Sequence, residues 1–195
     1  LPRAKRIKKL PATLDKNTFI KIFNEERNMK HKCWLLLAYC SGLREEEIAK
    51  VRIKDINPNE HKLKVLGKRK KERITILPDI TIKCMRIYYI QQYYPKYHKK
   101  VNKSGYLFEG IKGAEHINKC TIGNYFREIK EKYKLDDRIC FHSLRHSFAT
   151  NFIKAGGDPF VLKTMMGHAS ISTTDIYIHL GRDFNNLKGV NYDGI

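Results

Sequence analysis

Acidic residues are scarce in this chain relative to basic ones. Among its 195 residues, 20 are Asp or Glu and 39 are Lys or Arg, which gives a formal net charge of +19. So large an excess of one sign repels itself in the folded state and implies a polyanionic partner, with nucleic acid as the first candidate. Because binding would neutralise phosphates, it should weaken steeply as salt is added. An anionic membrane surface is the alternative partner.

Long apolar runs are also absent. The chain has no stretch of about 18 apolar residues that could cross a bilayer. Its basic start, residues 1–10, lacks the apolar core of a signal peptide. These absences argue against a membrane partner. They favour double-stranded DNA, and a cytoplasmic location in association with the nucleoid.

Cysteines show no pattern of pairing or metal binding. Their number, five, is odd and no Cys-x-x-Cys occurs, which indicates reduced thiols in a cytosolic protein, mostly packed inside. A hydrophobic content of 42% is enough for a real core. The length allows one sizeable domain or two small ones. The cysteines are Cys33, Cys40, Cys84, Cys120 and Cys140.

Hydrophobic periodicity predicts a mostly helical α+β domain with one small antiparallel sheet. Two strands, 61–66 and 73–77, bracket a basic tip at 67–72 and predict a hairpin. Polar caps and apolar faces predict the helices. We expect helices over about 15–27, 31–41, 44–50, 79–94, 118–133 and 160–166, and a further one within 138–155.

The second predicted helix leads directly to a candidate functional arginine. Its run WLLLAYC is apolar nearly all round, as in a buried helix. Gly42 then suits a left-handed cap, and Arg44 opens the next helix. An arginine followed by three glutamates is usually part of a solvated face. A rigid position directly after a buried helix favours function here, with a glutamate such as Glu47 orienting the guanidinium.

A second group of chemically active side chains lies near the end of the chain. Tyrosine is a poor nucleophile at neutral pH, because its unperturbed pKa is about 10. It becomes effective when cations and bases hold the group it attacks, and imidazoles with a guanidinium suit a phosphodiester. Within fewer than forty residues the chain carries His142, Arg145, His146, His168 and Tyr177. The apolar stripe of this segment should face inward, which leaves His142 and Arg145 free to face a groove.

The histidines also allow two other interpretations, a zinc site and a structural role. His142 and His146 are four apart and share a helix face, as in zinc hydrolases. In those enzymes a glutamate follows the first histidine, whereas Ser143 stands here and no carboxylate lies close by. Any single histidine is often structural, and we expect that role for His146, in packing or a hydrogen bond near the site.

The combined motifs resemble the tyrosine recombinases, that is, the phage integrases and Xer proteins, over about residues 10–180. His168 follows Arg145 by 23 positions (168 − 145), and Tyr177 follows His168 by 9 (177 − 168), as in that family. A Gly-Leu-Arg-x-x-Glu motif lies upstream, and a basic hairpin lies between the boxes. The matching segments are Ser41–Ile48, Leu66–Arg73, His142-x-Leu144-Arg145-His146, Gly167-His168 and Tyr177.

This resemblance implies a catalytic domain that cleaves and rejoins DNA through a 3′-phosphotyrosine, without metal or cofactor. Tyr177 would be the nucleophile, Arg44 and Arg145 would clamp the phosphate, and His168 would add a donor. His142 would assist proton transfer at the tyrosine. Lys68 would be the general acid. Where the family often has Gly next to this lysine, the chain has Arg69, so Lys70 stays a second candidate.

The resemblance also implies partners and boundaries. We expect DNA contacts from Arg69, Lys70, Lys71 and Arg127. On DNA the chain should form a homo-tetramer, and in isolation a monomer is compatible with the same resemblance. Residues 1–11 are expected to be a basic linker from a missing N-terminal core-binding domain, 12–180 the catalytic domain and 181–195 a C-terminal tail. Both a mobile-element integrase and a chromosomal Xer protein fit.

Three rival functions stay open at this point. A type IB topoisomerase shares the Arg, Lys, Arg, His and Tyr roles but only relaxes DNA, as a monomer. A DNA-binding regulator whose site has decayed would have lost at least one residue of the set. A metal-dependent nuclease would stop working in EDTA.

Overall fold

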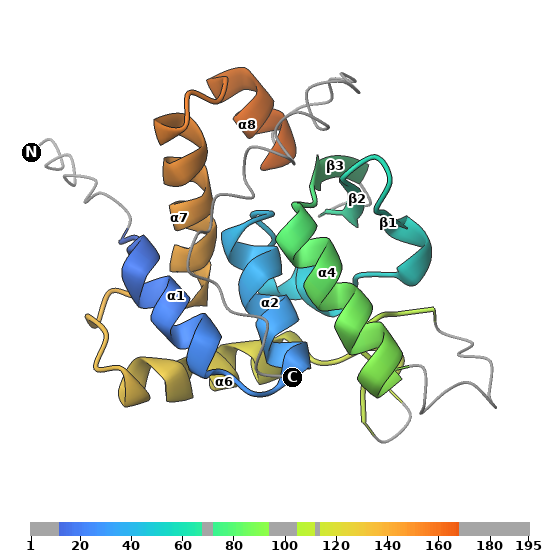
Figure 1. The fold of residues 1–195 in the computed structure, drawn as a ribbon, viewed down its shortest axis with the longest axis horizontal. Helices are drawn as coiled ribbons and strands as arrows, with labels where there is room; N and C mark the ends of the chain where they lie inside the picture. Colours follow the sequence, from blue (N-terminus) through green and yellow to red (C-terminus); the bar gives the residue numbers. More distant parts are fainter. Residues whose placement is uncertain (1–11, 68–71, 94–104, 112–113, 168–195) are drawn as a thin grey trace, which may run out of the picture.

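The structure is a computed structural model, which describes residues 12–67, 72–93, 105–111 and 114–167. Helices surround one central helix, and a small sheet lies to one side (Figure 1). In chain order the elements are α1 Lys16–Glu25, α2 Met29–Tyr39, α3 Glu45–Ala49, a 3₁₀ turn Ile53–Asp55, β1 Ile56–Asn57, β2 Lys62–Leu66, β3 Glu72–Ile76, α4 Asp79–Tyr88, a π-helical turn Tyr89–Tyr93, α6 Lys119–Lys132, α7 Phe141–Lys154 and α8 Pro159–Met165.

The central helix is α2, which lies between α4 and α7 (Figure 1). The side chain of Asn28 caps its start by accepting a hydrogen bond from the Lys30 N–H at 3.0 Å. Its apolar residues are buried on every side, as the sequence predicts, so neighbours pack on all its faces. Gly42 then adopts the predicted left-handed conformation, with φ of +68°. The chain therefore leaves the core at a fixed point just before α3.

The sheet has three antiparallel strands in the order β1-β2-β3. The predicted hairpin is confirmed, whereas the two-residue strand β1 was not expected. Alternation along β3 turns Arg73 and Thr75 inward and leaves Glu72 and Ile74 exposed. The Thr75 hydroxyl donates to the carbonyl of Ser41 at 2.7 Å. This bond holds β3 beside the turn that ends α2.

The predicted apolar stripe of α7 is confirmed. Its residues Phe141, Leu144, Phe148 and Phe152 are all buried. The last two join Ile76 at the end of β3 and Met165 at the end of α8 in a small second core. Apolar packing therefore brings β3 and α8 against the same helix, although they are far apart in the sequence.

Other expectations are confirmed with shifted boundaries. Asp15 caps α1, which ends at Glu25, and Asn118 caps α6. The helix expected over 79–94 is α-helical only to Tyr88, where a π-helical turn replaces it. All five cysteines are free; two, Cys120 and Cys140, are exposed, and the other three are buried. Within the described ranges, no helix combines the length and apolar character needed to cross a membrane.

Gly42 should tolerate no side chain. A Cβ at this position would meet Cδ1 of Phe148 at 2.5 Å, in addition to the strain of a positive φ. We expect Gly42→Ala to lower the free energy of unfolding by about 3 kcal/mol, from about 1–2 kcal/mol of left-handed strain and a similar amount of overpacking. Urea denaturation of purified protein measures this difference.

Gly156→Ala is the matched control, because Gly156 also has a positive φ but open space around its Cβ position. It should carry only the strain, about 1–2 kcal/mol. Equal losses of stability in the two variants would contradict the close approach of Phe148 to Gly42.

Candidate active site

Arg44 stands at the first position after the core turn. It is the N-cap residue of α3, and its backbone N–H donates to Oε2 of Glu47 at 2.8 Å. Its guanidinium donates to Oε1 of the same carboxylate at 3.0 Å, with the side chain 38% exposed. The expected pairing with Glu47 is therefore present. The carboxylate of Glu47 therefore fixes both the start of α3 and the guanidinium of Arg44.

Arg145 reaches the same place from α7, about one hundred positions later. Its Nη1 donates to the carbonyl of Gly42 and its Nη2 to the carbonyl of Met166, the latter at 2.6 Å. Nη1 also lies 3.6 Å from Oε2 of Glu47. The residue is only 2% exposed, so the expectation that it faces an open groove is wrong. The backbone carbonyls at the ends of α2 and α8 hold it inside.

A third arginine, Arg73 of β3, completes the cluster. Its Nη1 and Nη2 donate to the two carboxylate oxygens of Glu47 at 2.6 and 2.9 Å. Its Nε donates to the carbonyl of Met165 at 2.6 Å. Sequence reasoning had placed Arg73 only in the hairpin strand. The available signal was its alternation with Thr75, which puts a charged side chain on the inward face of a strand.

The charge of Glu47 is balanced by these three cations. Burial alone would raise the pKa of its carboxyl, but the hydrogen bonds and charge of Arg73, with contributions from Arg44 and Arg145, lower it below the ordinary value. Burial and the nearby charge of Arg44 lower the pKa of Arg145 to about 9, which leaves its guanidinium charged at neutral pH. Three cations and one anion leave a net positive site, suited to an anion.

Two histidines extend the cluster along α7. The rings of His142 and His146 have centroids 4.7 Å apart and are nearly perpendicular. Burial, His146 and Arg145 lower the pKa of His142, while burial and Arg145 lower the pKa of His146. Both imidazoles are therefore neutral at pH 7. His142 is exposed and able to take up a proton, whereas His146 is half-buried.

Several predicted residues lie outside the described ranges: Lys68, Arg69, Lys70, Lys71, His168 and Tyr177. The structure does describe the residues that flank them. Glu72 begins β3 directly after residues 68–71, and Gly167, with φ of +91°, ends the turn before His168. A Cβ on Gly167 would lie 3.3 Å from Cδ of Arg73. Glu72 and Gly167, the described residues next to the two undescribed segments, therefore both lie beside Arg73.

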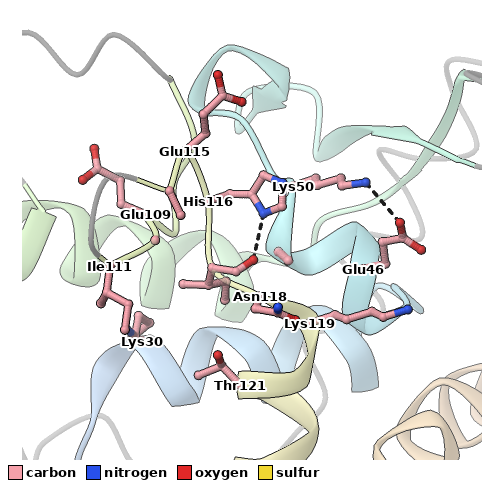
Figure 2. Close-up of a pocket in the computed structure, with 14 residues that line it drawn as sticks. Lys30, Glu46, Lys50, Glu109, Ile111, Glu115, His116, Asn118, Lys119 and Thr121 are labelled. Atoms are coloured by element: carbon pink, nitrogen blue, oxygen red, sulfur yellow. Dashed lines mark hydrogen bonds and ion pairs between the residues drawn. The ribbon is translucent and has the colours of Figure 1, made fainter.

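A separate cavity of about 640 Å³ lies between the start of α6 and the loop before it (Figure 2). Its walls carry charges of both signs, and Lys50 pairs with Glu46 at 3.1 Å. Nδ1 of His116 lies 2.7 Å from the carbonyl of Ile117. Of the residues predicted to act on DNA, those that the structure describes, Arg44, Arg127, His142 and Arg145, do not line it. In the part of the chain that the structure describes, no group of three His, Cys, Asp or Glu side chains is placed to hold a metal ion.

Known proteins resemble this chain in sequence and in fold. A tyrosine recombinase from Thermosipho africanus (strain TCF52B) is 32% identical over 183 residues, which cover 92% of this chain and 60% of that protein. The crystal structure of XerA recombinase aligns with a TM-score of 0.68 and 25% identity, over 92% of this chain and 64% of that one. The chain thus spans about 60% of the length of that curated relative.

A further solved structure shares the fold. The XerH site-specific recombinase, bound to palindromic difH substrate in a post-cleavage complex, aligns with a TM-score of 0.70 and 23% identity, over 88% of this chain and 50% of that one. The expected fold class, a mostly helical tyrosine recombinase catalytic domain with a small antiparallel sheet, is confirmed. A family model for the phage integrase family matches residues 5–183, nearly the whole chain, and the chain therefore belongs to the phage integrase family.

Proposed function

We propose that this chain is the catalytic part of a site-specific DNA recombinase that cuts and rejoins strands through a 3′-phosphotyrosine. The observation that carries the proposal is the meeting of Arg44 and Arg145 around one buried carboxylate. A net positive cluster with two neutral imidazoles beside it suits one phosphodiester. The net charge of +19 suits the rest of a DNA duplex.

The proposed chemistry is two transesterifications. The phenolic oxygen of Tyr177 attacks the phosphorus and forms a P–O bond, while the bond from phosphorus to the 5′-oxygen breaks. The phenolic proton passes to His142, and Lys68, or Lys70 in its place, supplies a proton to the leaving 5′-oxygen. Arg44, Arg145 and His168 stabilise the charge that develops on the non-bridging oxygens. Because the phosphotyrosine keeps the phosphodiester's energy, a new 5′-hydroxyl rejoins the strand without ATP.

Recombination is preferred to simple relaxation of DNA. The relatives described above are recombinases, and one of them was solved on its DNA substrate after cleavage. Exchange of strands between two duplexes requires four cleavages, which supports four copies of the chain on DNA. Arg127 lies exposed on α6, where it could contact a backbone phosphate outside the catalytic cluster.

Tyr177→Phe should abolish covalent capture of DNA and leave binding intact, because only the nucleophilic oxygen is removed. The probe is a pool of nicked duplexes with a randomised core, in which the short cleaved fragment diffuses away and traps the protein on the strand. Capture is followed by denaturing gels, and sequencing of the captured strands gives the preferred site. Gel shifts measure binding.

Tyr192→Phe is the matched control and should be captured like the wild type. Replacing Arg44 or Arg145 by Ala should slow capture by about 10²–10³-fold, the usual effect of losing one donor to a developing oxyanion. Capture of Tyr177→Phe at the wild-type level would assign the attack to another residue. Wild-type rates in both arginine variants would remove the phosphate clamp.

The surroundings of His142 predict a pKa below the ordinary histidine value of about 6.5. We expect its ring protons to titrate there in an NMR series without DNA, because burial and the neighbouring charges of His146 and Arg145 disfavour the imidazolium. His146→Asn should raise the pKa of His142, since it removes one of these neighbours. His116→Asn, in the separate cavity, should leave it unchanged; an unmoved pKa in His146→Asn would show that the two rings do not interact.

The proposed contact of Arg127 with a phosphate predicts a change in salt dependence. For a duplex of arbitrary sequence, Arg127→Ala should reduce the slope of log K against log salt by about one unit. Lys132→Ala is the control, because the Lys132 ammonium already lies 3.6 Å from the carboxylate of Glu25. Fluorescence anisotropy measures both slopes. An unchanged slope in Arg127→Ala would place α6 away from the duplex.

A further inference from the structure

The three arginines do not share Glu47 equally. Arg73 makes the two-pronged contact, at 2.6 and 2.9 Å, and the side chains of this pair are only 5% and 6% exposed. Arg44 makes one side-chain contact at 3.0 Å and is far more exposed, and Arg145 stands at 3.6 Å. A planar guanidinium fork matches a carboxylate better than either single contact does. The charge of Glu47 is therefore balanced chiefly by Arg73.

This division has a consequence for the other two cations. A carboxylate next to a phosphate site competes with the phosphate for every guanidinium it can reach. While Arg73 occupies Glu47, the positive charges of Arg44 and Arg145 stay largely available. Without Arg73, the Glu47 carboxylate would pair with Arg44 and Arg145 instead. The net positive charge of the cluster would also fall by one.

Arg73 also fixes the end of α8. The last carbonyls of a helix have no partner within it and carry partial negative charge. Nε of Arg73 donates a hydrogen bond to the carbonyl of Met165, and Nη2 of Arg145 donates one to the carbonyl of Met166, both at 2.6 Å. Gly167 lies against the aliphatic stem of Arg73, and the chain then continues to position 168. Arg73 itself directly follows the predicted basic tip, residues 67–72.

We propose that Arg73 is a positioning residue for strand cleavage: it occupies the Glu47 carboxylate so that Arg44 and Arg145 remain available to the phosphate, and it anchors the end of α8 beside them. This inference rests on the proposed function, because it assigns a task within that reaction. Arg73 itself is buried against Glu47 and acts without touching the DNA.

The first test uses charge compensation. With the nicked duplexes selected above, single-turnover capture should slow by about 100-fold in Arg73→Met, an effect like that of losing one catalytic donor. Adding Glu47→Gln removes the competing charge, so the double variant Arg73→Met/Glu47→Gln should recover about tenfold of that loss. Arg73→Lys keeps the charge but not the fork and should fall between wild type and Arg73→Met. Arg52→Met, which removes a half-buried arginine bonded to Tyr106, should capture normally.

The second test changes the phosphate instead of the protein. A methylphosphonate at the mapped cleavage position carries no negative charge on its non-bridging groups and depends less on a cationic clamp. The defect of Arg73→Met should shrink on this substrate. A general loss of folding would slow cleavage of both substrates equally, so this comparison separates positioning from stability.

The third test needs no DNA. The pKa of His142, followed by NMR, should rise in Arg73→Met, because the positive field around it weakens, and return towards the wild-type value in the double variant. If Arg73→Met does not fold, Arg73→Gln replaces it in all three tests. Melting temperatures identify the variants that are folded under the assay conditions.

Several outcomes would overturn the inference. Arg73→Met could cleave within about threefold of wild type, a factor too small for a lost electrostatic contact of this kind. The double variant could be no faster than Arg73→Met, or the pKa of His142 could stay unchanged. Failure of the wild-type chain to capture any duplex would instead refute the proposed function. The His142 titration needs no DNA, so it would still show whether Arg73 balances the charge of Glu47 beside Arg44 and Arg145.

Discussion

A buried carboxylate surrounded by guanidinium groups is the interaction on which the candidate site depends. An anion inside a protein is costly unless cations and hydrogen bonds surround it. Glu47 meets that condition only when α3, β3 and α7 are packed together, because each supplies one arginine. The arginines would in turn repel one another without the carboxylate. Assembly of the site and packing of these elements are therefore one event.

Apolar packing and backbone carbonyls give the cluster its shape. The second core, which holds Ile76, Phe148 and Met165, lies where β3, α7 and α8 meet. The donors of Arg145 then point at carbonyls, and backbone at the ends of well-packed helices moves little. A guanidinium held in this way is oriented before any substrate arrives, which is the condition for effective electrostatic stabilisation of a transition state.

The sequence was sufficient for features that depend on local spacing. The cap of α1, the left-handed Gly42 and the pairing of Arg44 with Glu47 all follow from residues a few positions apart. The family resemblance, confirmed by the match over residues 5–183, rested on motifs of the same kind. The predicted positions of Lys68, His168 and Tyr177 lie outside the described residues and stay predictions.

Features that depend on distant partners could not be predicted. Helical periodicity gives the direction of Arg145 around α7, but not its depth, which is set by carbonyls 103 and 21 positions away. Alternation with Thr75 indicates the inward direction of Arg73, but not its partners Glu47 and Met165, which lie 26 and 92 positions away. Strand β1 is two residues long, too short for any alternation to show.

The way α8 is held separates two kinds of evolutionary change. Arg73 and Arg145 donate hydrogen bonds to main-chain carbonyls at the end of this helix, and a replacement of side chains leaves those acceptors in place. An insertion or deletion of a single residue is different, because it rotates everything beyond it by about 100° and shifts it by about 1.5 Å. Among natural variants of this domain, the exposed positions of α8 should therefore vary in composition, while its positions in the second core stay apolar and its length stays fixed.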